Sequence, residues 1–225
     1  MSLRPSSVSR NVDSRQDRVH PRLESVVERH ISSAWNQPLH RPTVEAFAEL
    51  EMLGIGSDHR LVLDSGCGTG ESTRRIAQSL PDCLVIGVDK SLSRLSRTGI
   101  AAFPHREGNA VWLRAELSSF WRLALHAGWR LERHYLLYPN PWPKPAHLQR
   151  RWHAHPVFPD LLRLGGRLER RCNWEIYALE FAAAINRILD QEVRPKPLTG
   201  SDAISPFERK YRNSGHRLYS VVVTC

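Results

Sequence analysis

RLVLDSGCGTG, residues 60–70, is the stretch of sequence that decides the fold. Its apolar start predicts a short buried strand over Leu61–Leu63. The three glycines that follow predict a tight loop, because glycine lets the backbone turn without a Cβ in the way. The next residues, ESTRRIAQSL, predict a helix. A strand that breaks into a glycine loop and then a helix is typical of an open α/β sheet that binds ligands at the carboxyl ends of its strands.

The same alternation of strand and helix continues along the chain. CLVIGVDKS predicts a second strand that ends at Asp89, and SLSRLSRTGIAAF predicts the helix after it. AVWLRAEL predicts a third strand, HYLLYP a fourth, and RLYSVVVTC a final strand at the end of the chain. We therefore expect a Rossmann-like α/β fold, with a mostly parallel twisted sheet and helices on both faces, over residues 56–225.

Residues 1–55 are expected to form an N-terminal extension. Residues 1–16 are polar and lack periodicity, which predicts that they are disordered or weakly ordered. HPRLESVVERHISSA, residues 20–34, has apolar positions at helical spacing, and TVEAFAELEML predicts a second helix capped by Thr43 and ended near Gly54.

Composition favours a single α/β domain in the cytoplasm. The chain has 225 residues, 41% of them apolar, and no apolar run approaches the roughly 18 residues of a membrane span. The N-terminus lacks the apolar core of a secretory signal, and the four cysteines show no CxxC pair, so we expect reduced thiols. The oligomeric state stays open, with a monomer favoured.

The net charge of +9 is concentrated in one part of the chain. Residues 94–175 hold 14 Lys and Arg against 6 Asp and Glu, together with six of the seven tryptophans. Basic residues clustered with aromatic residues favour a nucleic-acid surface, and a solvated basic face is the alternative.

The glycine loop and the acids around it predict a cofactor site. Gly66, Gly68 and Gly70 follow a G-x-G-x-G spacing rather than the G-x-G-x-x-G of dinucleotide sites. Asp64, just before the loop, suits a ligand with cationic groups, such as S-adenosylmethionine with its sulfonium and ammonium. Asp89 is placed to accept from both ribose hydroxyls. Glu116 is placed to accept from the adenine amine, and an exposed acid at the end of a strand is the alternative.

The fourth strand ends in YPNPWPK, residues 138–144. Its prolines cannot continue a helix or a central strand, so this loop is rigid and holds Asn140 at the same crevice as the cofactor. Trp142 suits stacking on a base or burial against the end of the sheet. KPAHLQRRWHAH, residues 144–155, suits contact with phosphates. The metal alternative uses His147, His153, His155 and Cys172, but this spacing is poor for zinc, and we expect no metal.

With these stretches in place, the chain resembles the bacterial tRNA (guanine-N7)-methyltransferases from about residue 61 onward. The resemblance rests on ordered motifs, which are LDSGCGTG, IGVD, PNPWPK with His147, Arg150 and Arg151 beyond it, residues 158–168, RCNWEIYA and SPFERKYRNSGHRLYSVVV. It implies a cytoplasmic class I methyltransferase that uses S-adenosylmethionine and acts on tRNA. It also implies that the cofactor is surrounded by Asp64, Gly66, Gly68, Gly70, Asp89, Glu116 and Asn140.

The resemblance further implies which residues meet the target nucleotide, and where this chain departs from the family. Lys144 and Asn173 would contact the nucleotide, and SPFE, from Ser205 to Glu208, would complete the guanine pocket. The family has a catalytic Asp in P-D-P-W where this chain has Asn140, and an Asp where it has Asn173. Two alternatives stay open, namely an inactive methyltransferase-like RNA-binding protein and an amino-group nucleic-acid methyltransferase.

Overall fold

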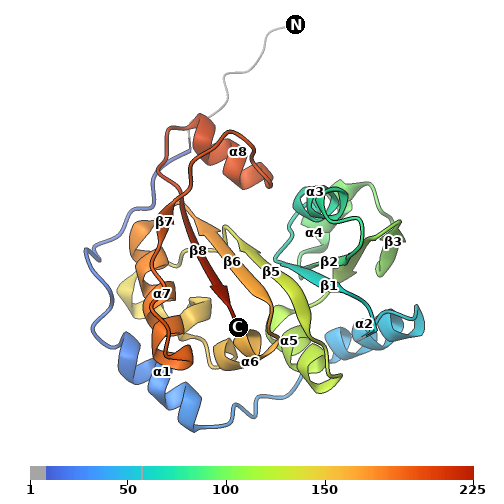
Figure 1. Cartoon of the computed structure of the whole chain (residues 1–225), viewed down its shortest axis with the longest axis horizontal. Helices are drawn as coiled ribbons and strands as arrows, with labels where there is room; N and C mark the ends of the chain where they lie inside the picture. The colour runs from blue at the N-terminus through green and yellow to red at the C-terminus, as the bar shows by residue number, and fades with distance from the viewer. Residues whose placement is uncertain (1–8, 57) are drawn as a thin grey trace, which may run out of the picture.

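A computed structural model describes residues 9–56 and 58–225, which form one sheet with helices on both faces (Figure 1). The eight strands lie in the order β3-β4-β2-β1-β5-β6-β8-β7. The strand bounds are β1 Leu61–Ser65, β2 Leu84–Asp89, β3 His105–Glu107, β4 Ala110–Arg114, β5 Leu131–Leu137, β6 Arg167–Cys172, β7 Lys196–Pro197 and β8 Tyr219–Thr224.

The central strands are parallel and the edge pairings are antiparallel. β4, β2, β1, β5 and β6 run in one direction, while β3, β8 and β7 pair antiparallel with their neighbours. Because parallel strands share one carboxyl edge, the loops after β1, β2, β4, β5 and β6 meet at the same end of the sheet. This arrangement confirms the expected Rossmann-like α/β fold.

The helices divide into two layers. The helix bounds are α1 Leu23–Ser32, α2 Arg41–Met52, α3 Glu71–Ser79, α4 Leu92–Leu95, α5 Leu117–His126, α6 Phe158–Arg163, α7 Glu175–Leu189 and α8 Pro206–Asn213, with 3-10 turns at Ser96–Thr98, Pro145–Arg150 and Trp152–Ala154. One buried core joins α1, α2, α5, α6 and α7 to the sheet, and a second lies under α3 and α4 on the other face. α8 lies across the upper end of the sheet in Figure 1.

Side-chain alternation along the strands produces these two cores. In β1, Leu61 and Leu63 face the larger core while Val62 faces the smaller one. Leu84 and Ile86 of β2 repeat this pattern on the neighbouring strand. A strand buried on both faces reads as a continuous apolar run, which is why β1 and β2 are recognisable from sequence.

Three expectations about local structure need correction. Thr43 does not cap α2, because the helix begins at Arg41 and the Thr43 hydroxyl instead accepts from the Glu116 N–H at 2.9 Å. The helix expected after Asp89 shortens to α4 and one 3-10 turn. Residues 9–16, expected to be disordered, are extended and hydrogen-bonded to the rest of the chain, while residues 1–8 lie outside the described part.

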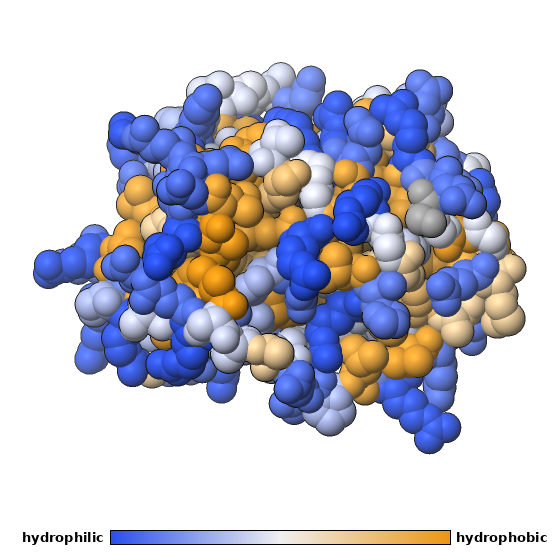
Figure 2. Space-filling view, turned by 60° about the horizontal axis from the view of Figure 1, so that its bottom comes forward, coloured by the Kyte–Doolittle hydropathy of each residue, from blue (hydrophilic) through white to orange (hydrophobic). Residues whose placement is uncertain are grey.

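The surface is polar over much of its area. Figure 2 shows hydrophilic side chains spread over one side of the molecule, with separate apolar areas between them. Across the described residues, no helix is both long enough and apolar enough to span a membrane.

A buried histidine under the sheet's carboxyl edge makes folding sensitive to acid. His134 in β5 is 1% exposed, and its Nε2 lies 2.8 Å from the Ser65 hydroxyl, which also accepts from the Trp121 indole N–H at 3.0 Å. Burial lowers the pKa of His134 to about 3. The unfolded chain therefore takes up a proton below about pH 6.5 that the folded chain refuses, so stability falls as the pH falls through this range.

We predict that His134→Gln will reduce the loss of stability between pH 7.5 and pH 5. Gln does not titrate, so the free energy of unfolding of the variant should fall by roughly 2 kcal/mol less than that of the wild type. Urea unfolding at the two pH values measures this difference. Burial raises the pKa of Asp64 to about 6, which acts in the opposite sense in both proteins and cancels in the comparison. Equal losses in the two proteins would contradict the prediction.

Candidate active site

The glycine loop presents its backbone to open space at the carboxyl end of β1. Gly66 and Gly68 have φ values of +79° and +61°, and a Cβ built at either would meet no described atom within 4 Å. The Gly66 and Cys67 N–H groups donate to the Val88 carbonyl at 2.8 and 3.1 Å, so the loop is tied to β2. The backbone of Gly66 and Gly68, here called the cradle, borders open space that a side chain would occupy. This open space suits a ligand that lies against the backbone.

Asp64 lies beneath the loop with one oxygen unused. The residue is fully buried, and its Oδ2 accepts from the Ser72 hydroxyl at 2.6 Å and the Thr73 hydroxyl at 2.8 Å. Its Oδ1 is buried with no hydrogen-bond partner among the described residues. A buried oxygen of this kind calls for a donor, and a ligand with an ammonium group supplies one.

Asp89 ends β2 beside the same loop. Its Oδ2 accepts from the Gly68 N–H at 2.9 Å, and its Oδ1 accepts from the Ser91 N–H at 2.8 Å. Arg94 lies 3.7 Å from Oδ2. Each carboxylate oxygen has room for a further donor, so Asp89 can hold a vicinal pair of hydroxyls while it shapes the loop.

Glu116 has a structural task that sequence reasoning did not anticipate. It is the N-cap residue of α5, and its carboxylate accepts from the Ser118 and Ser119 N–H groups and from the Ser118 hydroxyl, at 2.7–2.9 Å. These bonds hold its pKa below the usual value despite burial, which alone would raise it. The carboxylate is therefore neither a free ligand group nor the plain exposed acid of the alternative.

The loop after β5 holds Asn140 in a strained, rigid backbone. Tyr138 and Trp142 have φ values of +49° and +46°, a region that bulky residues rarely adopt. The Tyr138 N–H donates to the Arg171 carbonyl at 2.9 Å, and the Trp142 N–H approaches the Asn140 side-chain oxygen at 3.4 Å. Asn140 is exposed, as is Lys144.

Trp142 is not buried against the end of the sheet, and its stacking on a base stays a prediction. It is half-buried, with the His147 ring edge-on at 5.6 Å and the Arg150 guanidinium 4.9 Å from its ring centre. Together, Trp142 and Arg150 place a stacked cation beside Asn140.

Asn173, after β6, faces the segment that follows α8. Its side-chain N–H donates to His216 Nδ1 at 3.0 Å, which ties the end of β6 to the segment after α8. Since β5 and β6 are parallel neighbours, Asn173 and Asn140 lie at the same edge of the sheet. The two amides thus stand where the motif comparison expected two carboxylates.

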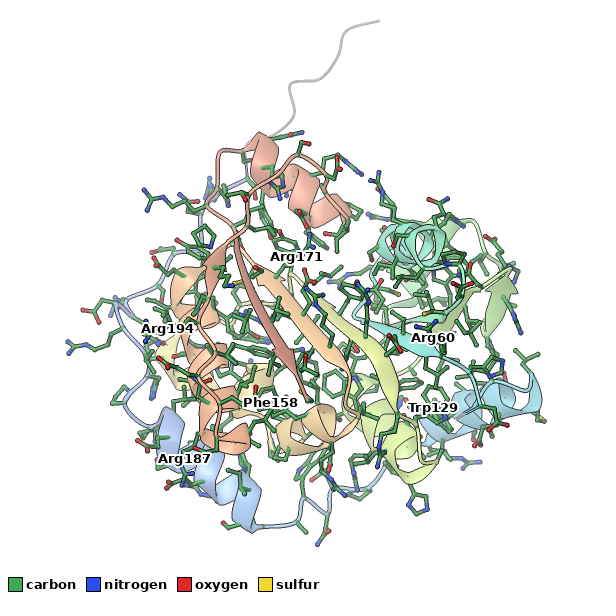
Figure 3. The ribbon with its side chains drawn as sticks, in the orientation of Figure 1. Arg60, Trp129, Phe158, Arg171, Arg187 and Arg194 are labelled. Atoms are coloured by element: carbon green, nitrogen blue, oxygen red, sulfur yellow. The ribbon has the colours of Figure 1, made fainter. Side chains whose placement is uncertain are left out.

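Ser205 and Glu208 are placed differently from the expectation that they face the nucleotide. Ser205 is the N-cap of α8, and its hydroxyl accepts from the Glu208 N–H at 3.1 Å. Glu208 is fully buried, and Arg171 and Arg212 donate to its carboxylate at 2.9 Å each. Figure 3 shows Arg171 between the end of the sheet and α8. The carboxylate therefore holds α8 against β6.

Sequence reasoning missed Glu180, and it placed Arg151 in a segment suited to phosphate contact, which the full burial of Arg151 contradicts. Arg151 is fully buried behind the PNPWPK loop, and it donates to the Trp142 carbonyl at 3.2 Å and to Glu180 at 2.5 Å. His153 lies 3.0 Å from Glu180. Arg151 belongs to the Arg150–Arg151 pair of the sequence motif. Glu180 lies in the apolar helix α7, and the one sequence signal for it is a charged residue at a position where the helix pattern expects a buried apolar one.

The histidines and the cysteine considered as metal ligands have other neighbours. His147 packs on Trp142, His153 bonds to Glu180, and His155 packs on Trp35 and Trp152. The Cys172 thiol donates to the Trp174 carbonyl at 3.3 Å. No group of three or more potential metal-ligating side chains was found within residues 9–56 and 58–225.

Comparison with known proteins identifies relatives in sequence. Residues 58–221 match the family described as "Putative methyltransferase". A tRNA (guanine-N(7)-)-methyltransferase of Brevibacillus brevis is 24% identical over 76% of this chain and 83% of its own length. One of Mycolicibacterium gilvum is 30% identical over 69% of this chain and 64% of its own length.

Solved structures share the fold at lower identity. The 16S rRNA methyltransferase KamB superposes with a TM-score of 0.55 at 17% identity, covering 84% of this chain and 94% of that one. An antibiotic-related methyltransferase superposes with a TM-score of 0.52 at 14% identity, covering 86% and 97%. These likenesses support the Rossmann-like class I fold.

Proposed function

Because the chain belongs to this methyltransferase family, we propose that it transfers a methyl group from S-adenosylmethionine to N7 of a guanine in tRNA. The observation that carries the proposal is the position of the PNPWPK loop. This loop and the glycine loop follow β5 and β1, which are parallel neighbours, so Asn140 stands beside the cradle of Gly66 and Gly68. A tRNA substrate implies a cytoplasmic protein.

The residues around the glycine loop fit S-adenosylmethionine. When bound, the cofactor supplies an electrophilic methyl group. Asp64 offers its unpaired oxygen to the ammonium group, and Asp89 accepts from the ribose hydroxyls. Gly66 and Gly68 leave room along the backbone for the cofactor. Gly70 instead makes room for the Trp112 indole, which a Cβ at this position would overlap. The Glu116 cap fixes the start of α5 at the adenine end. Asn140 closes the pocket on the acceptor side.

Guanine N7 needs no general base, because it carries a lone pair and no proton. The chain's task is to orient the base in line with the methyl group, and such orientation can supply up to roughly 7–11 kcal/mol of the barrier reduction. Asn140 can accept from a guanine N–H through its one carbonyl oxygen, whereas an aspartate would accept through two charged oxygens. Replacement of the family's aspartate by Asn140 therefore weakens the contact without removing it.

The nucleotide contacts divide into direct and indirect ones. Lys144 is exposed beside Asn140 and suits a phosphate or a base edge, and Asn173 lies at the same edge of the sheet as Asn140. Ser205 and Glu208 act indirectly, since they build α8 and hold Arg171 and Arg212. Arg150 adds a cation at the rim, and such contacts make RNA binding fall with salt.

A methyltransferase-like RNA-binding protein without turnover is the second candidate. The observation that favours it is the pair of amides, Asn140 and Asn173, which leaves this edge of the sheet without the family's two acids. Both candidates require the cofactor cradle and a basic surface, and turnover separates them. An amino-group methyltransferase would also use an Asn before Pro, but the later motifs do not support it.

We predict that the purified chain will transfer labelled methyl groups from S-adenosylmethionine to tRNA that lacks N7-methylguanine. The label should appear in N7-methylguanine after nuclease digestion, at a slow rate set by the weaker Asn140 contact. The same tRNA already methylated at N7 is the control and should accept little label. If no label enters guanine even at high enzyme concentration, the enzymatic proposal fails and the RNA-binding candidate stands.

Asn140→Asp is expected to preserve or raise this activity. A restored charge-assisted contact is worth roughly 1.5–3 kcal/mol, so the rate should hold or rise by up to about 100-fold. Gln149→Glu adds the same charge at an exposed position of the following segment and should leave the rate near the wild-type value. Collapse of activity in Asn140→Asp would show that the amide serves a different acceptor.

Asp89→Ala is expected to weaken S-adenosylmethionine binding by about 10- to 100-fold, because it removes the charged acceptor for the ribose hydroxyls. Isothermal titration calorimetry measures the change. Asp82→Ala, an exposed acid near the opposite end of the same strand, serves as the control. Unchanged affinity in Asp89→Ala would remove Asp89 from the cofactor site.

A further inference from the structure

Residues 9–20, here called the strap, run in extended form along the acceptor side of the molecule. In Figure 1 this blue segment descends from the region of α8 and β7 toward α1. Side chains alternate along it, with Val12, Ser14 and Gln16 turned inward and Asp13 and Arg15 exposed. The two polar side chains among the inward ones, Ser14 and Gln16, indicate a segment held by specific hydrogen bonds.

The first anchor joins the strap directly to the PNPWPK loop. The Ser14 hydroxyl donates to the Pro143 carbonyl at 2.6 Å, across 129 positions of sequence. Because Pro139, Pro141 and Pro143 have no N–H group, the loop can make few backbone hydrogen bonds of its own. Donors from elsewhere in the chain must therefore fix its carbonyls.

The second anchor works through Arg151. The Gln16 side-chain oxygen accepts from Arg151 Nη2 at 3.0 Å, and the Gln16 side-chain N–H donates to Glu180 at 2.5 Å. Arg151 in turn donates to the Trp142 carbonyl at 3.2 Å. Gln16 is thus one of the partners that hold the Arg151 guanidinium in place against the PNPWPK loop.

The ends of the strap are held as well. At the upper end, the Ser9 N–H donates to the Ser214 hydroxyl at 2.9 Å, and the Ser9 carbonyl lies 2.9 Å from His216 Nε2. His216 also bonds to Asn173. At the lower end, the His20 N–H donates to Glu180 at 3.0 Å.

We infer that the strap is a wall of the acceptor site, and that Ser14 and Gln16 are positioning residues that fix Asn140 and Lys144 through the loop carbonyls. The inference rests on the proposed function for its catalytic consequence, but the positioning itself is a property of the free protein. Ser14 acts through the PNPWPK loop and Gln16 acts through Arg151, so both act at a distance from the substrate. Asn140, in contrast, would contact the base directly.

The first test measures hydrogen–deuterium exchange of residues 138–151 in the full chain. Ser14→Ala and Gln16→Ala remove single hydrogen bonds, so amide exchange in this segment should accelerate about three- to tenfold. Ser14→Thr keeps the hydroxyl and should restore slow exchange. Asp13→Ala, on the exposed edge of the strap, should match the wild type. Wild-type exchange in both Ser14→Ala and Gln16→Ala overturns the inference.

The second test follows methylation kinetics in the same variants. Loss of positioning should lower kcat by about three- to tenfold while S-adenosylmethionine affinity stays within about twofold, because the cofactor cradle lies on β1 and β2. Equal losses in Ser14→Thr and Ser14→Ala would overturn a role for the hydroxyl. If the wild type shows no methylation, the proposed function fails, and faster exchange in Ser14→Ala still supports the strap.

Discussion

The buried ion pair of Arg151 and Glu180 is the interaction on which the acceptor side of the molecule depends. Both side chains are excluded from solvent. The Glu180 carboxylate also accepts from His153 and, in the strap, from the Gln16 side chain and the His20 N–H. Burial alone would raise the pKa of Glu180, but the hydrogen bonds from His153 and Arg151 and the positive charge of Arg151 outweigh burial and bring the pKa to about 2. Burial lowers the pKa of His153 to about 4, so at neutral pH it donates as an uncharged ring. Removing one partner of such a pair leaves a buried charge, at a cost of about 3–5 kcal/mol.

The cofactor side of the site is readable from sequence because its chemistry is local. Asp64 and Asp89 lie at the carboxyl ends of β1 and β2, and the glycines at 66, 68 and 70 follow β1. The apolar runs of β1 and β2 mark them as central strands. The sheet topology follows from the alternation of strands and helices. β6 escaped notice because four of its six residues are charged, and only its pairing with β5 and β8 makes it a strand.

The acceptor side is less readable because its contacts join distant segments. On this side, Ser205 and Glu208 have the hydroxyl and acid expected of ligand groups, yet a helix cap and two arginines engage them. Glu116, expected at the adenine, is likewise engaged as a helix cap. Residues 9–16 lack helical periodicity. Partly buried and exposed side chains alternate along them, but the reason for this alternation lies in their contact with the PNPWPK loop, which is distant in the sequence. A sequence motif identifies which side chains are available, whereas the fold decides which of them remain unpaired.

The long reach of the strap also governs the order in which the molecule is built. Its bonds span 129 residues to Pro143, 164 to Glu180 and 205 to Ser214. As the chain leaves the ribosome, the strap emerges first, but every partner it needs emerges later. Contacts of such sequence separation close late in folding. The bonds of the strap are therefore complete only after the chain has been synthesised as far as Ser214, so this side of the molecule is assembled late.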